Sequence, residues 1–544
     1  MISKSSNLYK LLPWVVTCIL LCPIIAIFLS AFVIDESGSF SHLVDTVLFT
    51  YISNSILVIL SVVLLSILFA MPSAWFVACC DFPTRKKLQW ALMLPLAMPP
   101  YIIAIVYTDL LDFTGPVQLT LRRLFSWQSI DDYYFPDIRT IFGASVILAL
   151  SLFPYLYLLL RSAFLTQSAG LFQAARTLGL SPIQAFWRVS IPLSRSAMAV
   201  GVSLIAMETL GDFATVNYFA VHTLTTAIYD TWLELGSLTT AAKISSMMLL
   251  AIVVLISLEN YSRRKQQVYQ RNSNGSVDLR FTLTGWKKWG VLGFTWSLVS
   301  FSLFIPIATL VYYAVHYFTE SLNDDLIHYT MNSLWLAFLV AILALAVALI
   351  VNFYQRLSPG FAAKSAIRLS SLGYAVPGTV VAIGVLIPLT SFDLLLNDFL
   401  LSWDLPPVGL ILSGSLVILV LGYLVRFSAI AVGSVDSSLV QVSPSLELAS
   451  RTLGNGPIKT LWRVNIPLIK KGMLTAFILV FIEAMKELPA ALLLRPFNFE
   501  TLATYVYQFV SDEMIEYAAL PALMIIALGL IPFIVVNRLL EKKR

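Results

Sequence analysis

The stretch LFQAARTLGLSPIQAFWRVSIPL at residues 171–193 recurs as LELASRTLGNGPIKTLWRVNIPL at residues 446–468. The two copies align without gaps at an offset of 275 residues and are identical at 14 of 23 positions. Shorter matches precede them: MPPYIIAI at 98–105 resembles VPGTVVAI at 376–383, and the pair Asn54-Ser55 recurs as Asn332-Ser333, both at an offset of 278. Matches at nearly constant offsets over this much of the chain predict two halves of the same design.

The composition around these copies is that of a membrane protein. Of the 544 residues, 58% are apolar and 12% are charged, whereas a soluble domain carries about 25% charged residues. Too few polar side chains are present to cover a globule of this size, which excludes a soluble enzyme, a disordered protein and a nucleic-acid-binding protein. The apolar segments are interpreted as helices, because isolated strands cannot satisfy their backbone groups in lipid.

We therefore expect an all-α polytopic membrane protein of about twelve transmembrane helices in two parallel six-helix repeats. An even number of spans brings the second repeat into the membrane from the same side as the first, unlike the inverted repeats of many secondary transporters. The apolar segments lie near 11–33, 52–79, 88–108, 140–160, 196–219 and 239–258 in the first half, and near 289–315, 331–354, 367–390, 408–432, 472–494 and 518–537 in the second.

The same segments define the expected domains. The first transmembrane half covers residues 1–259 with a core repeat of about 50–258, and the second covers 288–544 with a core of about 329–537; the polar residues 260–287 form a cytoplasmic linker. Alternate loops, with Lys4 and Lys10, hold 29 of the 35 Lys and Arg residues. They cover residues 85–87, 161–195, 263–288, 356–368, 426–471 and 538–544. By the positive-inside rule, these loops and both termini lie in the cytoplasm.

The duplicated stretch falls in such a loop, yet it has the pattern of a helix pair. Gly179 is expected to end the first helix in the left-handed conformation. Ser181 then caps the second helix, Pro182 is its first residue and Gln184 completes a capping box. We expect Pro192 to end this helix, since an interior proline interrupts the hydrogen bonding. The second copy keeps these features at Gly454, Pro457 and Pro467.

Each helix pair carries an apolar stripe and exposed cations. Trp187 and Arg188 in the first copy correspond to Trp462 and Arg463 in the second. A helix lying on the membrane surface would explain Trp and Arg, but not the Gly and Pro residues repeated at identical spacing. Two projections that dock into a partner protein explain both, and we favour that interpretation.

Acidic residues inside the predicted membrane segments are also duplicated. Glu208 and Asp212 in one half correspond to Glu483 and Glu487 in the other, again at an offset of 275. A charge at a helix centre costs about 2.5–3.5 kcal/mol on insertion scales and usually marks function. A pseudo-twofold axis would bring the four carboxylates together, where they would line a pathway for a cation or form structural ion pairs at the seam. Lys486 could pair with Glu483.

The loop spacing resembles the EAA loop of type I ABC importer permeases. The matching residues are Ala174, Ala175, Gly179 and Pro192 in the first copy, and Ala449, Gly454 and Pro467 in the second. Gln173 and Leu448 replace the motif's glutamate, with Glu447 one residue early in the second copy. The resemblance implies that these loops form coupling helices for two copies of an ATP-binding subunit. The chain has no G-x-x-x-x-G-K-[ST] motif, so we expect it to be no enzyme, to bind no cofactor itself, and to leave ATP and Mg to that partner.

A closer resemblance is carried by METLGDFATVNYFAV at 207–221, by MKELPAALLLRPFNFETLATYVYQ at 485–508 and by YTDLLDFTGPVQ at 107–118. These stretches resemble the fused ferric iron permeases of the same superfamily. The resemblance implies a bacterial inner-membrane protein that receives ferric iron from a periplasmic substrate-binding protein. The loop at 109–138 is long and aromatic, which suits docking of that protein. Permeases for thiamine, polyamines or another small solute are alternatives. An ion-coupled secondary transporter and a non-transporting scaffold are alternatives of another class, and the sequence identifies no metal ligands.

Overall fold

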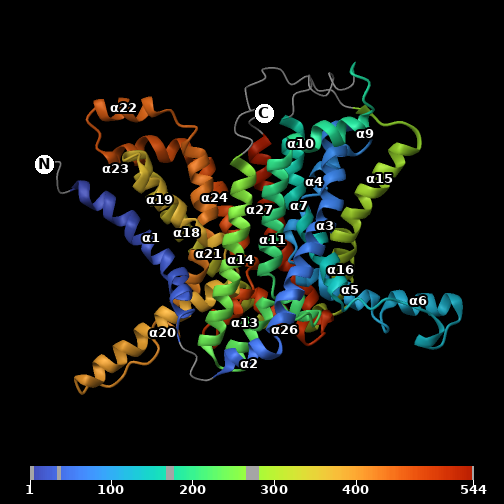
Figure 1. Cartoon of the computed structure of the whole chain (residues 1–544), viewed down its shortest axis with the longest axis horizontal. Helices are drawn as coiled ribbons and strands as arrows, with labels where there is room; N and C mark the ends of the chain where they lie inside the picture. Colours follow the sequence, from blue (N-terminus) through green and yellow to red (C-terminus); the bar gives the residue numbers. More distant parts are fainter. Residues whose placement is uncertain (1–4, 34–37, 167–176, 265–280, 542–544) are drawn as a thin grey trace.

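The computed structural model describes residues 5–33, 38–166, 177–264 and 281–541, which are helical apart from connecting loops and one two-stranded sheet. Figure 1 shows the longer helices running side by side as a bundle. Nine helices of the described part are long and apolar enough to cross a membrane, or ten with the bent pair Phe186–Leu193 and Arg195–Gly211. The all-helical polytopic fold is therefore confirmed. The expected segments near 472–494 and 518–537 correspond to a broken helix and to the last helix, α27.

The first half contains α1 (Ser5–Ser30), α2 (Ser39–Thr46), α3 (Leu48–Cys79), β1 (Cys80–Asp81), α4 (Arg85–Ala91), η1 (Leu94–Ala97), α5 (Pro100–Leu111), α6 (Pro116–Phe125), η2 (Ile130–Asp132), α7 (Ile141–Thr166), α9 (Pro182–Ala185), η3 (Phe186–Ser190), α10 (Ile191–Leu193), α11 (Arg195–Gly211), α12 (Ala214–Tyr218), α13 (Leu224–Leu233) and α14 (Leu238–Arg264). The predicted segment at 88–108 is thus not one helix. It breaks at Met98-Pro99, where the backbone becomes extended.

The second half contains β2 (Phe281–Thr282), α15 (Gly285–Val299), η4 (Ser300–Phe304), α16 (Ile305–His316), α17 (Phe318–Ser321), α18 (Asp324–Leu357), α19 (Phe361–Ser370), η5 (Leu372–Ala375), α20 (Gly378–Ser402), α21 (Leu416–Leu439), α22 (Pro444–Thr452), α23 (Pro457–Thr460), η6 (Leu461–Asn465), α24 (Ile466–Lys486), α25 (Pro489–Leu494), α26 (Leu502–Ser511) and α27 (Ile515–Glu541). The elements follow in the order of the first half, and the break recurs at Val376-Pro377.

An outer helix of each half packs against the opposite half. α1 packs against α19 and α20 of the second half, so closely that a Cβ added at Gly384 would lie 2.7 Å from the Pro23 carbonyl oxygen. In return, α16 packs against α5, and the Tyr107 hydroxyl donates a hydrogen bond of 2.6 Å to the Phe301 carbonyl. β1 pairs with β2 in parallel, which fastens the end of the linker to the first half. The buried apolar core consequently runs through both halves.

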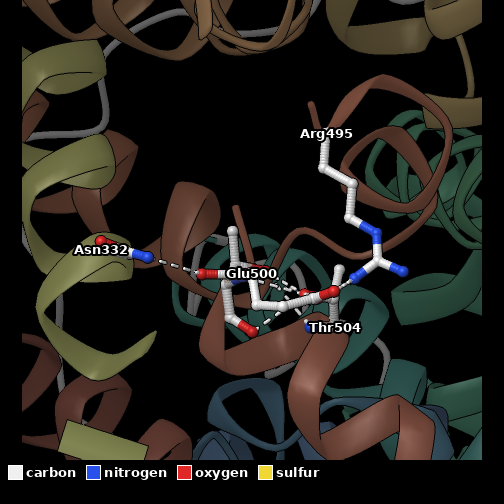
Figure 2. A network of polar contacts seen from close by, with 5 residues as sticks. Asn332, Arg495, Glu500 and Thr504 are labelled. Atoms are coloured by element: carbon white, nitrogen blue, oxygen red, sulfur yellow. Dashed lines mark hydrogen bonds and ion pairs between the residues drawn. The ribbon is translucent and has the colours of Figure 1, made fainter. Parts of the chain in front are cut away.

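The Asn-Ser repeats fix equivalent loops at one end of the bundle. Figure 2 shows the Asn332 amide group directed at the Glu500 backbone, to which it donates a hydrogen bond of 3.2 Å. Glu500 also forms an ion pair with Arg495 and accepts a hydrogen bond from the Thr504 hydroxyl. In the first half, Asn54 donates to the His222 carbonyl at 3.0 Å. The backbone bond is thus duplicated, whereas the ion pair is a feature of the second half.

The prediction that Pro192 and Pro467 end their helices is wrong at Pro467. The π-helical turn Leu461–Asn465 leads directly into α24, which contains Pro467 in its first turn and continues to Lys486. Proline is tolerated there because the π turn directly before it changes the local hydrogen-bond pattern, which is one way that membrane helices accommodate a missing N–H. The same π turn precedes Pro192, and the path bends only at Ser194.

Candidate functional site: a charged cavity at the seam between the halves

Helix α11 ends one residue before Asp212, whose backbone is extended. The Asp212 carboxylate then accepts hydrogen bonds from the backbone N–H groups of Thr215 at 3.0 Å and Val216 at 3.2 Å, and from the Thr215 hydroxyl. It therefore caps the short helix α12, as acidic residues commonly do at helix N-termini. The expected segment 196–219 is consequently a broken helix with an acidic residue at the break.

The second half repeats this arrangement. α24 ends at Lys486, Glu487 is extended, and its Oε1 accepts the backbone N–H of Ala490 at 3.1 Å. Pro489 opens α25, as expected for a proline in the first turn. One carboxylate of each acidic pair is thus a helix cap, while Glu208 and Glu483 remain on the continuous helices.

The breaks of the two halves converge on one cavity of about 100 Å³, which has room for several water molecules. All four duplicated carboxylates line it. The Met98-Pro99 break closes one side, and on another side Gly211 lies against Pro377 of the opposite half. The remaining lining residues include Leu96, Pro100, Tyr101, Leu148, Ser151, Leu152, Tyr155, Ala214, Arg426, Lys486, Leu488 and Pro489.

Two cations from the second half face these acids. The Lys486 ammonium lies 2.8 Å from Glu483, which is the pairing expected from the sequence. Arg426 lies 3.3 Å from the Glu487 Oε1, and the Tyr374 hydroxyl donates a hydrogen bond of 3.3 Å to Glu208. Four carboxylates and two cations leave the lining with a formal charge of −2.

The expected position of Arg426 in a cytoplasmic loop is wrong. Arg426 lies within α21, and its side chain is only 14% exposed. The signal was present, because Arg426 interrupts the apolar segment 408–432, and a charge there usually marks function.

The second helix pair forms the predicted structure on one side of the bundle. Gly454 has a φ of +79°, the left-handed conformation expected after α22. Glu447 is buried there and accepts hydrogen bonds from Arg356 at 2.7 Å and Asn465 at 3.0 Å. The carboxylate therefore anchors α22 to α18 and to the π turn. Ala449, Pro457, Arg463 and Pro467 are exposed.

The first helix pair is described from Thr177 onward, so Ala174 and Ala175 lie outside the described residues. Gly179 has a φ of +87°. The capping box is confirmed, since the Gln184 side chain accepts the Ser181 N–H at 2.9 Å and the Gln184 N–H is directed at the Ser181 hydroxyl at 3.3 Å. Pro182 begins α9, and Arg188 is exposed.

The two helix pairs reach the same end of the bundle. In Figure 1, α9 and α22 lie on opposite sides of that end, where α1 begins and α27 finishes. Trp187 is 57% exposed and Trp462 is 64% exposed, and Leu178 and Leu453 are more than 80% exposed. Such apolar surface at equivalent places is typical of protein interfaces.

The family model of the binding-protein-dependent transport system inner membrane component matches residues 81–267 and again 346–544. The chain belongs to this family. It is accordingly a multi-pass inner-membrane permease of an ABC importer, a non-catalytic component, and the two matches support the duplication of its halves.

Known permeases align either with most of the chain or with less than half of it. The Fe(3+)-transport system permease protein FbpB 2 of Haemophilus influenzae is 25% identical over 491 residues, covering 90% of this chain and 89% of its own. The ferric transport system permease protein FbpB of Actinobacillus pleuropneumoniae is 24% identical, covering 90% and 72%. The molybdenum transport system permease protein ModB of Escherichia coli is 31% identical over 216 residues, covering 38% of this permease and 91% of its own chain.

Proposed function

We propose that this permease forms a complete translocation pore in one chain, with twelve spans in two parallel halves, and that its cargo is ferric iron. The observation that carries the proposal is the cavity at the seam, where duplicated carboxylates from both halves meet with a formal charge of −2. Hard cations prefer oxygen ligands such as carboxylates. The names of the relatives that align over 90% of the chain also support this cargo.

The same proposal assigns partners to the two ends of the bundle. One copy of an ATP-binding subunit would seat on each helix pair, with ATP and Mg bound in that subunit. Exposed Trp187 and Trp462 at equivalent positions support this docking. Both termini would then lie in the cytoplasm, and a periplasmic binding protein would deliver cargo at the opposite end. Helices α11 and α24 follow the helix pairs directly and carry Glu208 and Glu483 into the cavity, so they would transmit the movement.

An oxyanion permease is the second candidate. Arg426 and Lys486 line the same cavity, and the chain also aligns with permeases named for molybdenum and sulfate. The two candidates predict opposite effects of removing a cation, since loss of a positive charge strengthens attraction for a metal ion and weakens it for an oxyanion.

Uptake by reconstituted vesicles tests the proposal. The permease with its ATPase and binding protein is supplied with radiolabelled ferric iron, molybdate or sulfate. We expect ATP-dependent iron uptake that falls in a Glu208→Gln, Glu483→Gln double variant which still assembles and hydrolyses ATP. The control is Glu483→Gln combined with Lys486→Gln, which leaves the net charge unchanged. Full iron uptake by the double variant would refute the pathway role, and uptake without an ATPase would favour an ion-coupled transporter.

A further inference from the structure

Two segments project sideways from the bundle at the end opposite the helix pairs. The first arm is α6 with the loop up to Tyr134, and the second arm is residues 393–413, the end of α20 with the loop after it. Figure 1 shows α6 and the end of α20 pointing away from the centre in opposite directions. We propose that both arms lie in the outer lipid interface and anchor the permease there.

The positions of the arms follow from the length of the preceding segments. Residues 85–111, with their break, already exceed the about 20 residues that a helix needs to cross a bilayer. Of the candidate span Pro100–Phe125, only α5 is therefore needed for the crossing, and α6 begins after it. Residues 361–387, which precede the second arm, are likewise long enough to cross the bilayer. Both arms therefore begin where a span has been completed, at the level of the headgroups.

The first arm has the chemistry of an interfacial helix. Val117, Leu124 and Phe125 share one face of α6 at spacings of seven and eight residues, and Leu124 is 72% and Phe125 60% exposed. Arg123 is exposed, and the Arg122 guanidinium donates a hydrogen bond of 2.7 Å to the Phe113 carbonyl and lies 3.9 Å from the centre of the Phe113 ring. A short helix with an apolar face and basic residues beside it is typical of segments in the membrane interface, where the cations meet lipid phosphates.

Aromatic side chains continue this surface beyond α6. Phe125, Trp127 and Tyr133 form a continuous stack, with ring centroids 4.8 Å and 4.7 Å apart. Trp and Tyr are enriched at membrane interfaces because their rings have an apolar body and a polar edge. The stack thus extends the lipid-facing surface of the spans onto the arm.

The second arm is a rigid hairpin with an apolar exterior. Buried Asp393 accepts the backbone N–H groups of Leu412 and Ser413, and the Asn397 side chain accepts that of Gly409. These bonds hold the loop against the helix. Large apolar side chains nevertheless point outward, with Leu395 and Trp403 each 68% exposed.

Lipid explains the two arms better than the binding protein that the aromatic loop suggested. Cargo must enter the cavity at the seam between the halves, whereas both arms point away from that seam (Figure 1). Their apolar side chains would also face water whenever the binding protein is absent, which is unfavourable for surface of this size. The inference needs only the membrane location of the permease and does not depend on its cargo.

Photo-crosslinking tests directly whether lipid contacts the two arms. A photoreactive phenylalanine analogue replaces Phe125 or Phe399, in the full permease with its ATPase, in nanodiscs of phosphatidylethanolamine and phosphatidylglycerol. Phe125 and Phe399 are 60% and 59% exposed, so the larger side chain of the analogue can be accommodated without disturbing the core. We expect lipid-mass adducts at both positions, unchanged when purified binding protein is added.

The matched control places the same analogue at Phe497, which is fully exposed in the loop before α26 and lies on neither arm. We expect several-fold less lipid adduct there. Equal lipid labelling at Phe497, adducts with the binding protein at Phe125 and Phe399, or no lipid adduct at either arm would each overturn the proposal.

Discussion

Replacing Gly378 with alanine should separate the buried ion pair of the cavity. A Cβ at Gly378 would lie 2.4 Å from the Arg426 Nη1 and 2.5 Å from the Glu487 Oε1. Both atoms are side-chain ends, whereas the third neighbour, the Ala490 backbone nitrogen, lies farther away at 3.1 Å. The methyl group is therefore accommodated mainly by pushing the two charged groups apart, with a shift of a few tenths of an ångström at the start of α25.

The size of the effect follows from the pair distance. At 3.3 Å and an effective dielectric constant of about 20, two unit charges attract by about 5 kcal/mol. A separation of about 5 Å lowers this attraction to about 3 kcal/mol. We expect Gly378→Ala to lose about 2 kcal/mol of stability.

Gly211→Ala is the matched control, because Gly211 lines the same cavity but its added Cβ meets Pro377 at an ordinary distance of 3.4 Å. The assay is the thermal inactivation of both purified variants in nanodiscs, together with their ATPase stimulation by the binding protein. Gly378→Ala should inactivate earlier and hydrolyse ATP with weaker coupling, and Gly211→Ala should match the parent. Equal behaviour of the two variants would refute the reasoning.

Three further predictions concern single contacts. Arg356→Gln leaves buried Glu447 without its cation, so it should cost about 2 kcal/mol and weaken binding of purified ATPase in a pull-down; unchanged binding would contradict an anchoring role. Asn332→Ala and Asn54→Ala each remove one equivalent hydrogen bond, so each should cost about 1 kcal/mol in thermal inactivation, and a large difference would show that the halves are not equivalent there. Ser181→Ala should destabilise α9 by about 1 kcal/mol, seen as faster hydrogen exchange with α22 as the internal reference.

Local signals in the sequence predicted much of the structure. Gly179 and Gly454 adopt the expected left-handed conformation, and Ser181 and Gln184 form the expected capping box. These features depend on a few neighbouring residues, so spacing alone determines them. The four duplicated carboxylates also converge as expected, because equivalent positions in two packed repeats meet at the seam.

The breaks in the helices were harder to predict, because a broken and a continuous apolar helix have the same hydropathy. Residues 88–108 carry no charged side chain, yet Pro99 and Pro377 divide their segments, and the break at Met98-Pro99 lines the cavity. Asp212 and Glu487 could be recognised as charges in a span but not as helix caps, since that role requires knowing where α11 and α24 end. Arg426 was misplaced for a related reason: counting charges cannot separate the end of a span from its interior.

The four carboxylates of the cavity are duplicated in the two halves, but the two basic residues that face them, Arg426 and Lys486, are not. At the offset of 275, Arg426 and Lys486 correspond to Ser151 and Gly211. Both carboxylates of the second half are therefore neutralised within that half, Glu483 by Lys486 and Glu487 by Arg426.

The first half supplies the carboxylates that its own helices do not neutralise. Asp212 is occupied in capping α12, whereas Glu208 accepts one hydrogen bond among the described residues, from Tyr374. Glu208 is thus the group best placed to meet a cation in the cavity. We expect Glu208→Gln to lower iron uptake at least tenfold, about 1.4 kcal/mol in transport free energy, and Glu483→Gln combined with Lys486→Gln to lower it much less. The measurement is uptake per ATP hydrolysed by variants at equal density in vesicles. If the two variants lost uptake equally, the asymmetry of charge between the halves would have no part in selecting the cargo.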